Sequence, residues 1–175
     1  MLVASRDTAT KAHAVFMNPL CIAPARPEQA AEISSLIKSL AHYFVPDQSR
    51  EVAQAFLATF EPPAIEALLA DASCRYYAAT QGDALVGVCA LKDGRKVYHL
   101  FVASEAHGRG VARALWERAS ADARCGEPAA GGGVFTVNSS VHAVPVYERL
   151  GFRPTGPQQE RNGVRFVPME LTTGP

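Results

Sequence analysis

The residues best suited to chemistry are two glycines in a turn between a strand-like segment and a helix-like one. Residues 96–102 are apolar enough for a buried strand, and residues 110–123 place apolar side chains at helical spacing. At the start of a helix, backbone N–H groups converge with the positive end of the helix dipole and can hold a phosphate. Gly108 and Gly110 permit the backbone angles and the close approach that a bound diphosphate requires. The segment therefore predicts a phosphate-binding turn.

Two arginines, Arg109 and Arg113, can add positive charge to this turn. Arg113 stands where the dinucleotide-binding fingerprint needs its third glycine, and we expect no parallel strand–helix–strand unit around the segment. No Gly-Lys-Ser/Thr sequence follows, so the P-loop pattern is also absent. Both nucleotide-binding patterns are disfavoured, and ordinary turn glycines are the structural alternative.

A second helix-like segment carries Tyr147. Residues 142–150 have helical spacing, and a short strand-like run at 134–138 precedes them. Pro145 fits the first turn, where its missing N–H costs little, and Gly151 is a typical left-handed terminator. Because Tyr147 shares a helical face with apolar residues, a core aromatic is its structural alternative.

Both segments resemble motifs of the GNAT acetyltransferases. The glycine turn is similar to their motif A, Gln/Arg-x-x-Gly-x-Gly/Ala, in the residues His107-Gly108-Arg109-Gly110-Val111-Ala112. His107 stands where Gln or Arg is usual, which changes a side chain and is expected to leave the backbone amide in place. The tyrosine helix is similar to motif B, which ends in Tyr-Glu-x-Leu-Gly-Phe and here runs from Asn138 to Phe152. The resemblance extends over roughly residues 20–171.

In this family the amides of motif A hold the pyrophosphate of CoA, so the resemblance implies acetyl-CoA as co-substrate and no metal. It implies the following cofactor-binding residues: Phe101, Val102, His107, Gly108, Arg109, Gly110, Val111, Ala112, Arg113, Asn138 and Ser140. The backbone of Phe101 and Val102 is expected to pair with the pantetheine arm and to polarise the acetyl carbonyl. Tyr147 is expected to protonate the departing thiolate, which a phenol of pKa about 10 can do when held in place.

The general base is open between two histidines. An amine must lose a proton before it attacks, so a base or a water chain is expected. His99, on the strand beside the glycine turn, is the first candidate, and His142, near the start of the tyrosine helix, is the second. Some family members carry a Glu earlier on this strand, where Lys96 stands here. Each histidine has a structural alternative as a hydrogen-bonded core residue.

The acceptor pocket of this family is walled in part by the first helices and their connection. The break between the first two helix-like segments makes His42, Tyr43 and Phe44 candidate substrate-binding residues, with packing under a loop as the alternative. Ser140 either caps its helix or touches pantetheine. Asn138 either closes a turn or binds ligand.

Hydrophobic periodicity predicts the elements that position these residues. Before the glycine turn it predicts a strand at 20–25, helices at 29–40, 49–60 and 64–70, and strands at 75–80, 84–91 and 96–102. After the turn it predicts a helix at 110–123, a strand at 134–138, a helix at 142–150 and a closing strand at 163–171. Pro62 and Pro63 are expected to stop the helix before them.

The three strands before the glycine turn indicate an antiparallel meander, since only short turns join them. The resemblance implies an α/β (α+β) fold, with a mixed, mostly antiparallel sheet flanked by helices and splayed between its fourth and fifth strands. We expect one domain at 19–175, preceded by a flexible extension at 1–18 whose charges are unlike a secretory peptide.

Composition narrows the function classes. The 175 residues are 48% hydrophobic, enough for one sizeable core. Basic and acidic residues both number 17, which leaves no charge footprint for nucleic acid or an anionic membrane and mildly disfavours a polyamine substrate. No apolar run approaches the roughly 20 residues that span a bilayer. Four widely separated cysteines indicate neither a disulfide framework nor a metal site, so we expect a cytoplasmic protein.

The activity implied by the resemblance is transfer of an acetyl group from acetyl-CoA to a primary amine, by direct attack in a ternary complex. The acceptor is open between a small metabolite, an antibiotic, a polyamine and a protein amine. A homodimer is compatible with the sequence, since members of the family often pair. A non-catalytic acyl-CoA-binding sensor or scaffold is one alternative, and a transferase of longer acyl groups is another.

Overall fold

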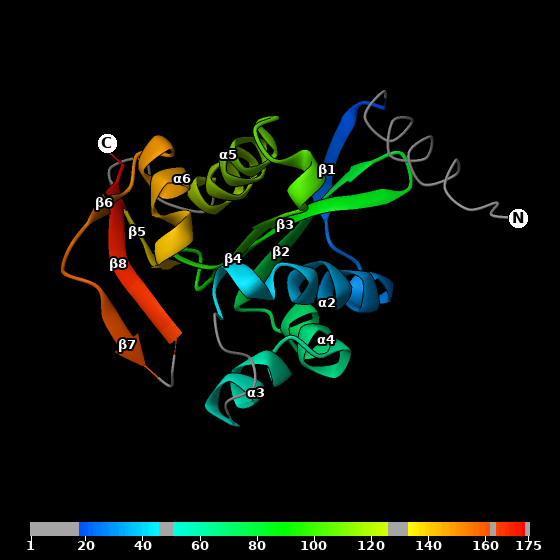
Figure 1. Ribbon diagram of the computed structural model, residues 1–175. Coiled ribbons are helices and arrows are strands. Elements are labelled where there is room, and N and C mark those ends of the chain that lie inside the picture. Colours follow the sequence, from blue (N-terminus) through cyan, green and yellow to red (C-terminus); the bar gives the residue numbers. More distant parts are fainter. Residues whose placement is uncertain (1–17, 46–50, 126–132, 162–163, 174–175) are drawn as a thin grey trace, which may run out of the picture.

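The protein folds around one eight-stranded sheet with helices on both faces (Figure 1). The computed structural model describes residues 18–45, 51–125, 133–161 and 164–173, and leaves out the side chain of Val52. All but the last residue of the predicted extension at 1–18 lies outside these ranges. Within them, no helix is both long and apolar enough to span a membrane.

The sheet has the strand order β1-β2-β3-β4-β5-β8-β6, and β7 pairs with β8. Its strands are β1 Leu20–Pro24, β2 Cys74–Gln81, β3 Ala84–Lys92, β4 Lys96–Val102, β5 Val134–Ser140, β6 Arg153–Pro154, β7 Gln159–Arg161 and β8 Val164–Thr172. The β4–β5 pair is parallel, and all the other pairs are antiparallel. Because the helix at Val111–Arg124 lies between β4 and β5 in the chain, the expectation that no parallel strand–helix–strand unit surrounds the glycine turn is wrong. The predicted mixed, mostly antiparallel sheet is therefore confirmed.

Helices cover the two faces of the sheet in separate groups (Figure 1). The α-helices are α2 Ala30–Ser39, α3 Glu51–Ala58, α4 Pro62–Ala70, α5 Val111–Arg124 and α6 Val144–Arg149. The 3₁₀ turns are η1 Pro27–Gln29, η2 Ala41–Tyr43, η3 Ser104–Ala106 and η4 Val141–Ala143. Helices α5 and α6 lie over one face, and α2 and α4 lie over the other with α3 beside them.

Most predicted elements appear within a few residues of their expected bounds, and the exceptions have local causes. Helix α3 ends at Ala58, before Pro62 and Pro63, as predicted. The two prolines also occupy the first turn of α4, where the missing N–H of proline costs no helical hydrogen bond, so that helix begins earlier than predicted. The predicted helix at 142–150 divides into η4 and α6. Strands β6 and β7 were not predicted, since they have only two and three residues and exposed side chains.

Two hydrophobic cores lie on opposite sides of the sheet. The core under α5 and α6 includes Leu115, Trp116 and Tyr147. The core under α2 and α4 includes Ile33 and Ile65. Strands β2 and β3 contribute to both cores, because successive side chains of a strand point to opposite faces. Residues on β4 can therefore serve two chemically different faces.

Strands β4 and β5 pair at their beginnings and then separate. Their register contains only Lys96 with Thr136 and Val97 with Val137. On the other side of β4 the register to β3 shifts so that Tyr98 is an extra residue between two paired ones, which is a β-bulge. Because a bulge bends its strand, it accounts for the divergence that follows Val97. The predicted splay between the fourth and fifth strands is confirmed.

Candidate active site

The apex of the splay is flanked by Tyr98 on β4 and Asn138 on β5, each the first residue beyond the last paired one. Tyr98 is 42% exposed. Asn138 is also exposed and remains in the strand, paired with Pro168 of β8, so the alternative that it closes a turn is wrong. Beyond the apex, no strand among the described residues pairs with the edge of β4 that faces β5, which leaves backbone groups such as the Val102 N–H available to a ligand.

The glycine turn stands at the open end of β4. Gly108 has φ of 72° and Gly110 has φ of 80°, a left-handed conformation that glycine adopts without steric cost. A Cβ atom built on either glycine would meet no atom within 4 Å. Backbone conformation, and not crowding, therefore requires glycine here, and open space lies above both residues. A diphosphate could lie directly on this stretch of backbone.

The first turn of α5 offers backbone donors to that space. Gly110 is the N-cap, and no side chain caps the helix. The first helical hydrogen bond runs from the Ala114 N–H to the Gly110 oxygen at 2.9 Å, so the N–H groups of Val111, Ala112 and Arg113 have no acceptor within the helix. Three such donors at a helix N-terminus form an anion site when aligned with the helix dipole.

Gly87 on β3 brings the first turn of α5 close to the sheet. A Cβ atom at Gly87 would lie 3.0 Å from Leu115 Cδ1, 3.0 Å from the Phe101 oxygen and 3.2 Å from Val111 Cγ1. Any larger side chain would push α5 away from β4. Sequence analysis did not single out Gly87, because a strand glycine shows its packing partner only in the folded structure.

His107 is tied to the end of β4 by both its backbone and its ring. Its N–H donates to the Ser104 oxygen at 3.2 Å. Its Nε2 lies 2.8 Å from the Val102 oxygen and must donate to it, since a carbonyl only accepts. The His107 N–H is therefore used within the turn that follows β4, and its place in a phosphate cradle stays a prediction.

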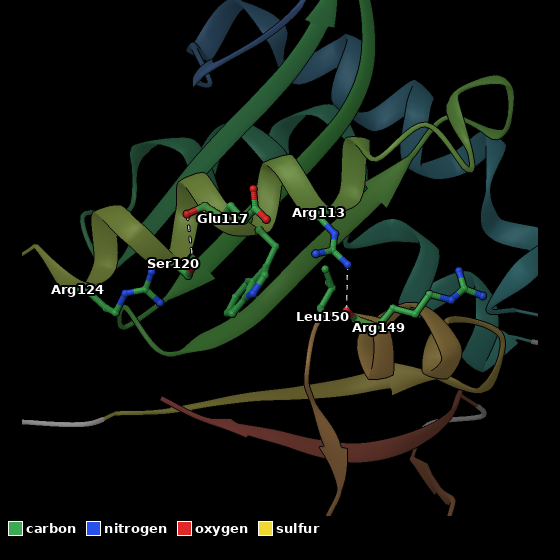
Figure 2. A pocket seen from close by; sticks show the side chains of 7 residues that line it. Arg113, Glu117, Ser120, Arg124, Arg149 and Leu150 are labelled. Carbon is green, nitrogen blue, oxygen red and sulfur yellow. Dashed lines mark hydrogen bonds between the residues drawn. The ribbon is translucent and has the colours of Figure 1, made fainter. Parts of the chain in front are cut away.

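Arg113 also borders a groove between α5 and α6 (Figure 2). Its Nη2 donates to the Arg149 oxygen at 3.4 Å, a long hydrogen bond that joins the two helices. The groove has a volume of about 260 Å³ and is lined by Arg113, Trp116, Glu117, Ser120, Arg124, Arg149 and Leu150. Arg109, in the turn itself, is exposed. Both arginines that were predicted to add charge therefore lie at the surface around the turn.

Tyr147 belongs to the core under α5 and α6 and is 6% exposed. Its ring packs edge-on against Phe152 with centroids 5.4 Å apart. Within the described part of the chain its hydroxyl forms no hydrogen bond. Burial, and to a lesser extent the Cys89 thiol, raises the pKa of Tyr147 above the ordinary value of 10. The hydroxyl therefore stays protonated, as a proton donor must be.

His99 lies on the opposite face, in the α2–α4 layer. It is 6% exposed, and its Nδ1 lies 2.8 Å from the Tyr76 hydroxyl. The rings of Phe60 and Phe101 pack around it with centroids at 5.4 and 5.5 Å. Burial lowers the pKa of His99 from 6.5 to about 3, so the imidazole is neutral at physiological pH. These contacts agree with the structural alternative, and its role as a base stays a prediction.

The predicted acceptor residues meet both sides of the splay. The Tyr43 ring stacks on His142 at 4.4 Å, touches His42 at 4.0 Å and lies 6.2 Å from His107. Because His107 follows β4 and His142 follows β5, Tyr43 contacts a ring from each side of the opening. Phe44 packs instead on Phe101 of β4, with centroids 5.4 Å apart.

Ser140 ends β5 and accepts a hydrogen bond from the Ala143 N–H at 3.3 Å. It therefore caps the turn that leads into α6, and contact with pantetheine stays a prediction. In the described ranges, no group of three or more His, Cys, Asp or Glu side chains is arranged to hold a metal ion.

Comparison with known proteins agrees with this arrangement. A family model described as an acetyltransferase (GNAT) domain matches residues 44–173. No curated protein matches the chain. A GCN5-related N-acetyltransferase from Rhodopseudomonas palustris superposes with a TM-score of 0.71 at 22% identity, covering 87% of this chain and 94% of that one.

Two further similar structures were determined with the cofactor bound. The PaiA N-acetyltransferase from Thermoplasma acidophilum, in complex with CoA, gives a TM-score of 0.70 at 12% identity over 88% of this chain and 99% of that one. YncA from Salmonella typhimurium, with acetyl-CoA, gives a TM-score of 0.59 at 19% identity, covering 88% of this chain and 94% of that one. Such identities show a shared fold. Because the family match spans most of the chain and the fold agrees with it, this chain belongs to the GNAT acetyltransferase family.

Proposed function

We propose that the protein is an acetyl-CoA-dependent N-acetyltransferase, which transfers the acetyl group to a primary amine by direct attack while both substrates are bound. The observation that carries the proposal is the opening between β4 and β5 beyond Val97, with the left-handed Gly108–Gly110 turn at its outer end. The similar proteins whose structures contain CoA or acetyl-CoA support the choice of co-substrate.

The residues present fit CoA. The open space over Gly108 and Gly110 and the free N–H groups that follow suit its pyrophosphate. The Val102 N–H and the Leu100 backbone lie on the edge of β4 that faces the opening, and they suit the amide groups of the pantetheine arm, which need backbone partners. The Val102 oxygen already accepts from His107, and the Phe101 backbone is directed at β3. Acetyl-CoA supplies the acetyl thioester. The chain itself holds and orients this molecule, and a hydrogen bond from the β4 backbone polarises the acetyl carbonyl.

Tyr147 donates the proton that the departing sulfur needs. Its raised pKa keeps the phenol protonated, and its hydroxyl has no competing partner among the described residues. Proton donation by a positioned side chain contributes about 10²- to 10⁴-fold in rate. A buried donor with a free hydroxyl suits this task.

Direct attack is favoured because Cys89, which shares the core of Tyr147, is a poor nucleophile. Cys89 is fully buried on β3, and burial raises the pKa of its thiol to about 12. Since only the thiolate attacks readily, an acetyl-cysteine step is disfavoured.

The general base is chosen between two histidines. His99 lies on β4, two residues before Phe101, yet burial lowers its pKa to about 3, which makes it a poor acceptor of protons from an ammonium group. This favours His142, which is exposed at the rim and stacked on Tyr43.

Substitution of Tyr147 tests the proposal. Tyr147→Phe should lower kcat by roughly 10- to 1000-fold in a thiol-release assay, with the Kd of acetyl-CoA within about twofold of wild type. Tyr77→Phe is the matched control, because it removes a largely buried hydroxyl on the same side of the sheet that bonds only Asp122. Equal kcat in Tyr147→Phe and wild type would remove the acid role. Acetyl-CoA binding without turnover of any amine would favour the sensor alternative.

A further inference from the structure

The α2–α4 side of the splay is lined by aromatic rings. Phe44 packs on Phe101 at 5.4 Å and on Phe60 at 5.8 Å. Phe60 reaches His99 at 5.4 Å, and His99 stacks on Tyr98 at 4.8 Å. We call these rings, together with the adjacent Tyr43, the aromatic wall. It runs from the Tyr43 rim to the apex at Tyr98.

Part of this wall is open to solvent. Tyr98 is 42% exposed, and Tyr43, Phe44 and Phe101 are half-buried. Phe60 and His99 are buried behind them. Four rings from η2 and β4 can therefore touch a ligand that approaches the splay from this face, while the two buried rings hold the wall in position.

The charged groups at the lower end of the wall form an ion pair. The Lys92 ammonium lies 5.8 Å from the Tyr98 ring centroid and 3.6 Å from the Asp71 carboxylate, so charges of both signs meet there. The described contacts of the rings of the wall are with other rings and with Lys92. Ring faces are therefore the main surface that the wall offers to a ligand.

We propose that the acceptor is a primary amine carried on an aromatic or planar apolar group, and that it binds against Tyr43, Phe44, Tyr98 and Phe101. This inference rests on the proposed acetyltransferase function. Ring faces attract a single ammonium, and offset or edge-on packing holds a planar body. Desolvation against apolar rings also lowers the pKa of the amine, which favours the neutral form that attacks.

The proposed transfer to such an amine conserves atoms, electrons and protons. The amine nitrogen forms a bond to the acetyl carbon as the carbon–sulfur bond breaks. One proton leaves the nitrogen and one reaches the sulfur, giving an N-acetyl amide and CoA with a free thiol. No oxidant, reductant or metal is required.

An amine panel tests the proposal with the full chain and acetyl-CoA. The panel comprises 2-phenylethylamine and tryptamine on one side, and spermidine, kanamycin and a lysine-containing peptide on the other. From the strength of aromatic and cation–π contacts, kcat/KM should be at least about tenfold higher for the two aryl amines. Faster turnover of spermidine, kanamycin or the peptide would overturn the aromatic assignment and leave the acetyltransferase function standing.

Ring removal tests the site itself. Tyr43→Leu and Tyr98→Leu should each raise the KM for 2-phenylethylamine by about tenfold, with kcat within about threefold, since they remove binding and not chemistry. The Kd of acetyl-CoA should stay at the wild-type value in both leucine variants. Tyr43→Phe and Tyr98→Phe, which keep the ring, should restore the preference for aryl amines. An unchanged KM in both leucine variants would contradict the claim that the amine binds against these rings. Tight binding of acetyl-CoA with no amine turned over would overturn the proposed function and the acceptor class together.

Discussion

The two faces of the sheet at the splay differ in what they present to a ligand. The α5–α6 face offers backbone N–H groups from the Gly108–Ala112 stretch and one buried phenol, Tyr147. The α2–α4 face offers side-chain rings and a neutral histidine, His99. One face suits a charged ligand whose phosphates are the same in every reaction, and the other suits a variable apolar partner.

This difference separates recognition by backbone from recognition by side chains. Backbone N–H donors are positioned by the conformation of the chain and do not depend on which side chains the residues carry. The turn therefore requires a left-handed φ at its two glycines and little else. Rings recognise shape and polarity, so in the proposed function the identities of these rings decide which amine binds. The same strand, β4, presents an unpaired backbone edge toward β5 and packs the Phe101 ring against Phe44 on the other face.

The largest expected effect comes from breaking the backbone side. Gly110→Val places a β-branched residue at φ of 80° and fills the space above the turn. Acetyl-CoA affinity should fall roughly 100-fold or more, equivalent to about 2.7 kcal/mol, as measured by calorimetric titration. Gly94→Val is the matched control, because Gly94 has φ of 66° and equally open surroundings at the far end of β4.

Both valine variants should lose stability alike, by about 1–2 kcal/mol for the left-handed conformation. Only Gly110→Val should lose the ligand. Equal acetyl-CoA affinity in the two variants would mean that the phosphates bind elsewhere.

An effect of intermediate size, on the pH dependence of stability, is expected from His99, the buried histidine of the α2–α4 face. Unfolded His99 takes up a proton below pH 6.5, whereas the folded protein resists protonation down to about pH 3. Between these values the unfolded state binds more protons, so the free energy of unfolding falls as pH falls, by up to about 1.4 kcal/mol per unit. Urea unfolding at pH 7, 6 and 5 should show this slope in wild type and a smaller one in His99→Gln. The same slope in both proteins would show that His99 does not resist protonation.

The smallest effect is expected at Ser140. Ser140→Ala removes the cap on the Ala143 N–H and should cost about 1 kcal/mol, while Ser140→Thr should retain most of it. Differential scanning calorimetry should then show a Tm lower by about 2–4 °C for the alanine variant. A tenfold loss of acetyl-CoA affinity in Ser140→Ala would instead add Ser140 to the ligand contacts.

The backbone side could be predicted from the sequence because it is local. The strand at 96–102, the two glycines and the helix after them are contiguous, so periodicity and turn chemistry define them together. Tyr147 and Gly151 were found in the same way, and Gly151 does end α6 with φ of 98°.

The aromatic side could only be predicted in part, because its rings come from distant segments. His42, Tyr43 and Phe44 were named from their place between helices, but Phe60 and Tyr98 join them only through tertiary packing. The bulge at Tyr98 arises from the register with β3, which no single strand encodes. Phe60 was predicted to end the helix at 49–60, but α3 ends at Ala58 and Phe60 lies in the turn that follows. The helical pattern also gives no information about the rings that Phe60 packs against.

The most direct test of the account is an amide-resonance map of the labelled protein during titration with acetyl-CoA. The largest shifts should fall on Gly108, Gly110, Val111 and the Leu100–Val102 backbone, with little change in β1 or β6. Such a pattern would place the ligand in the splay under the glycine turn. Shifts centred on the α5–α6 groove, or no shifts at all, would contradict the claim that this opening binds acetyl-CoA.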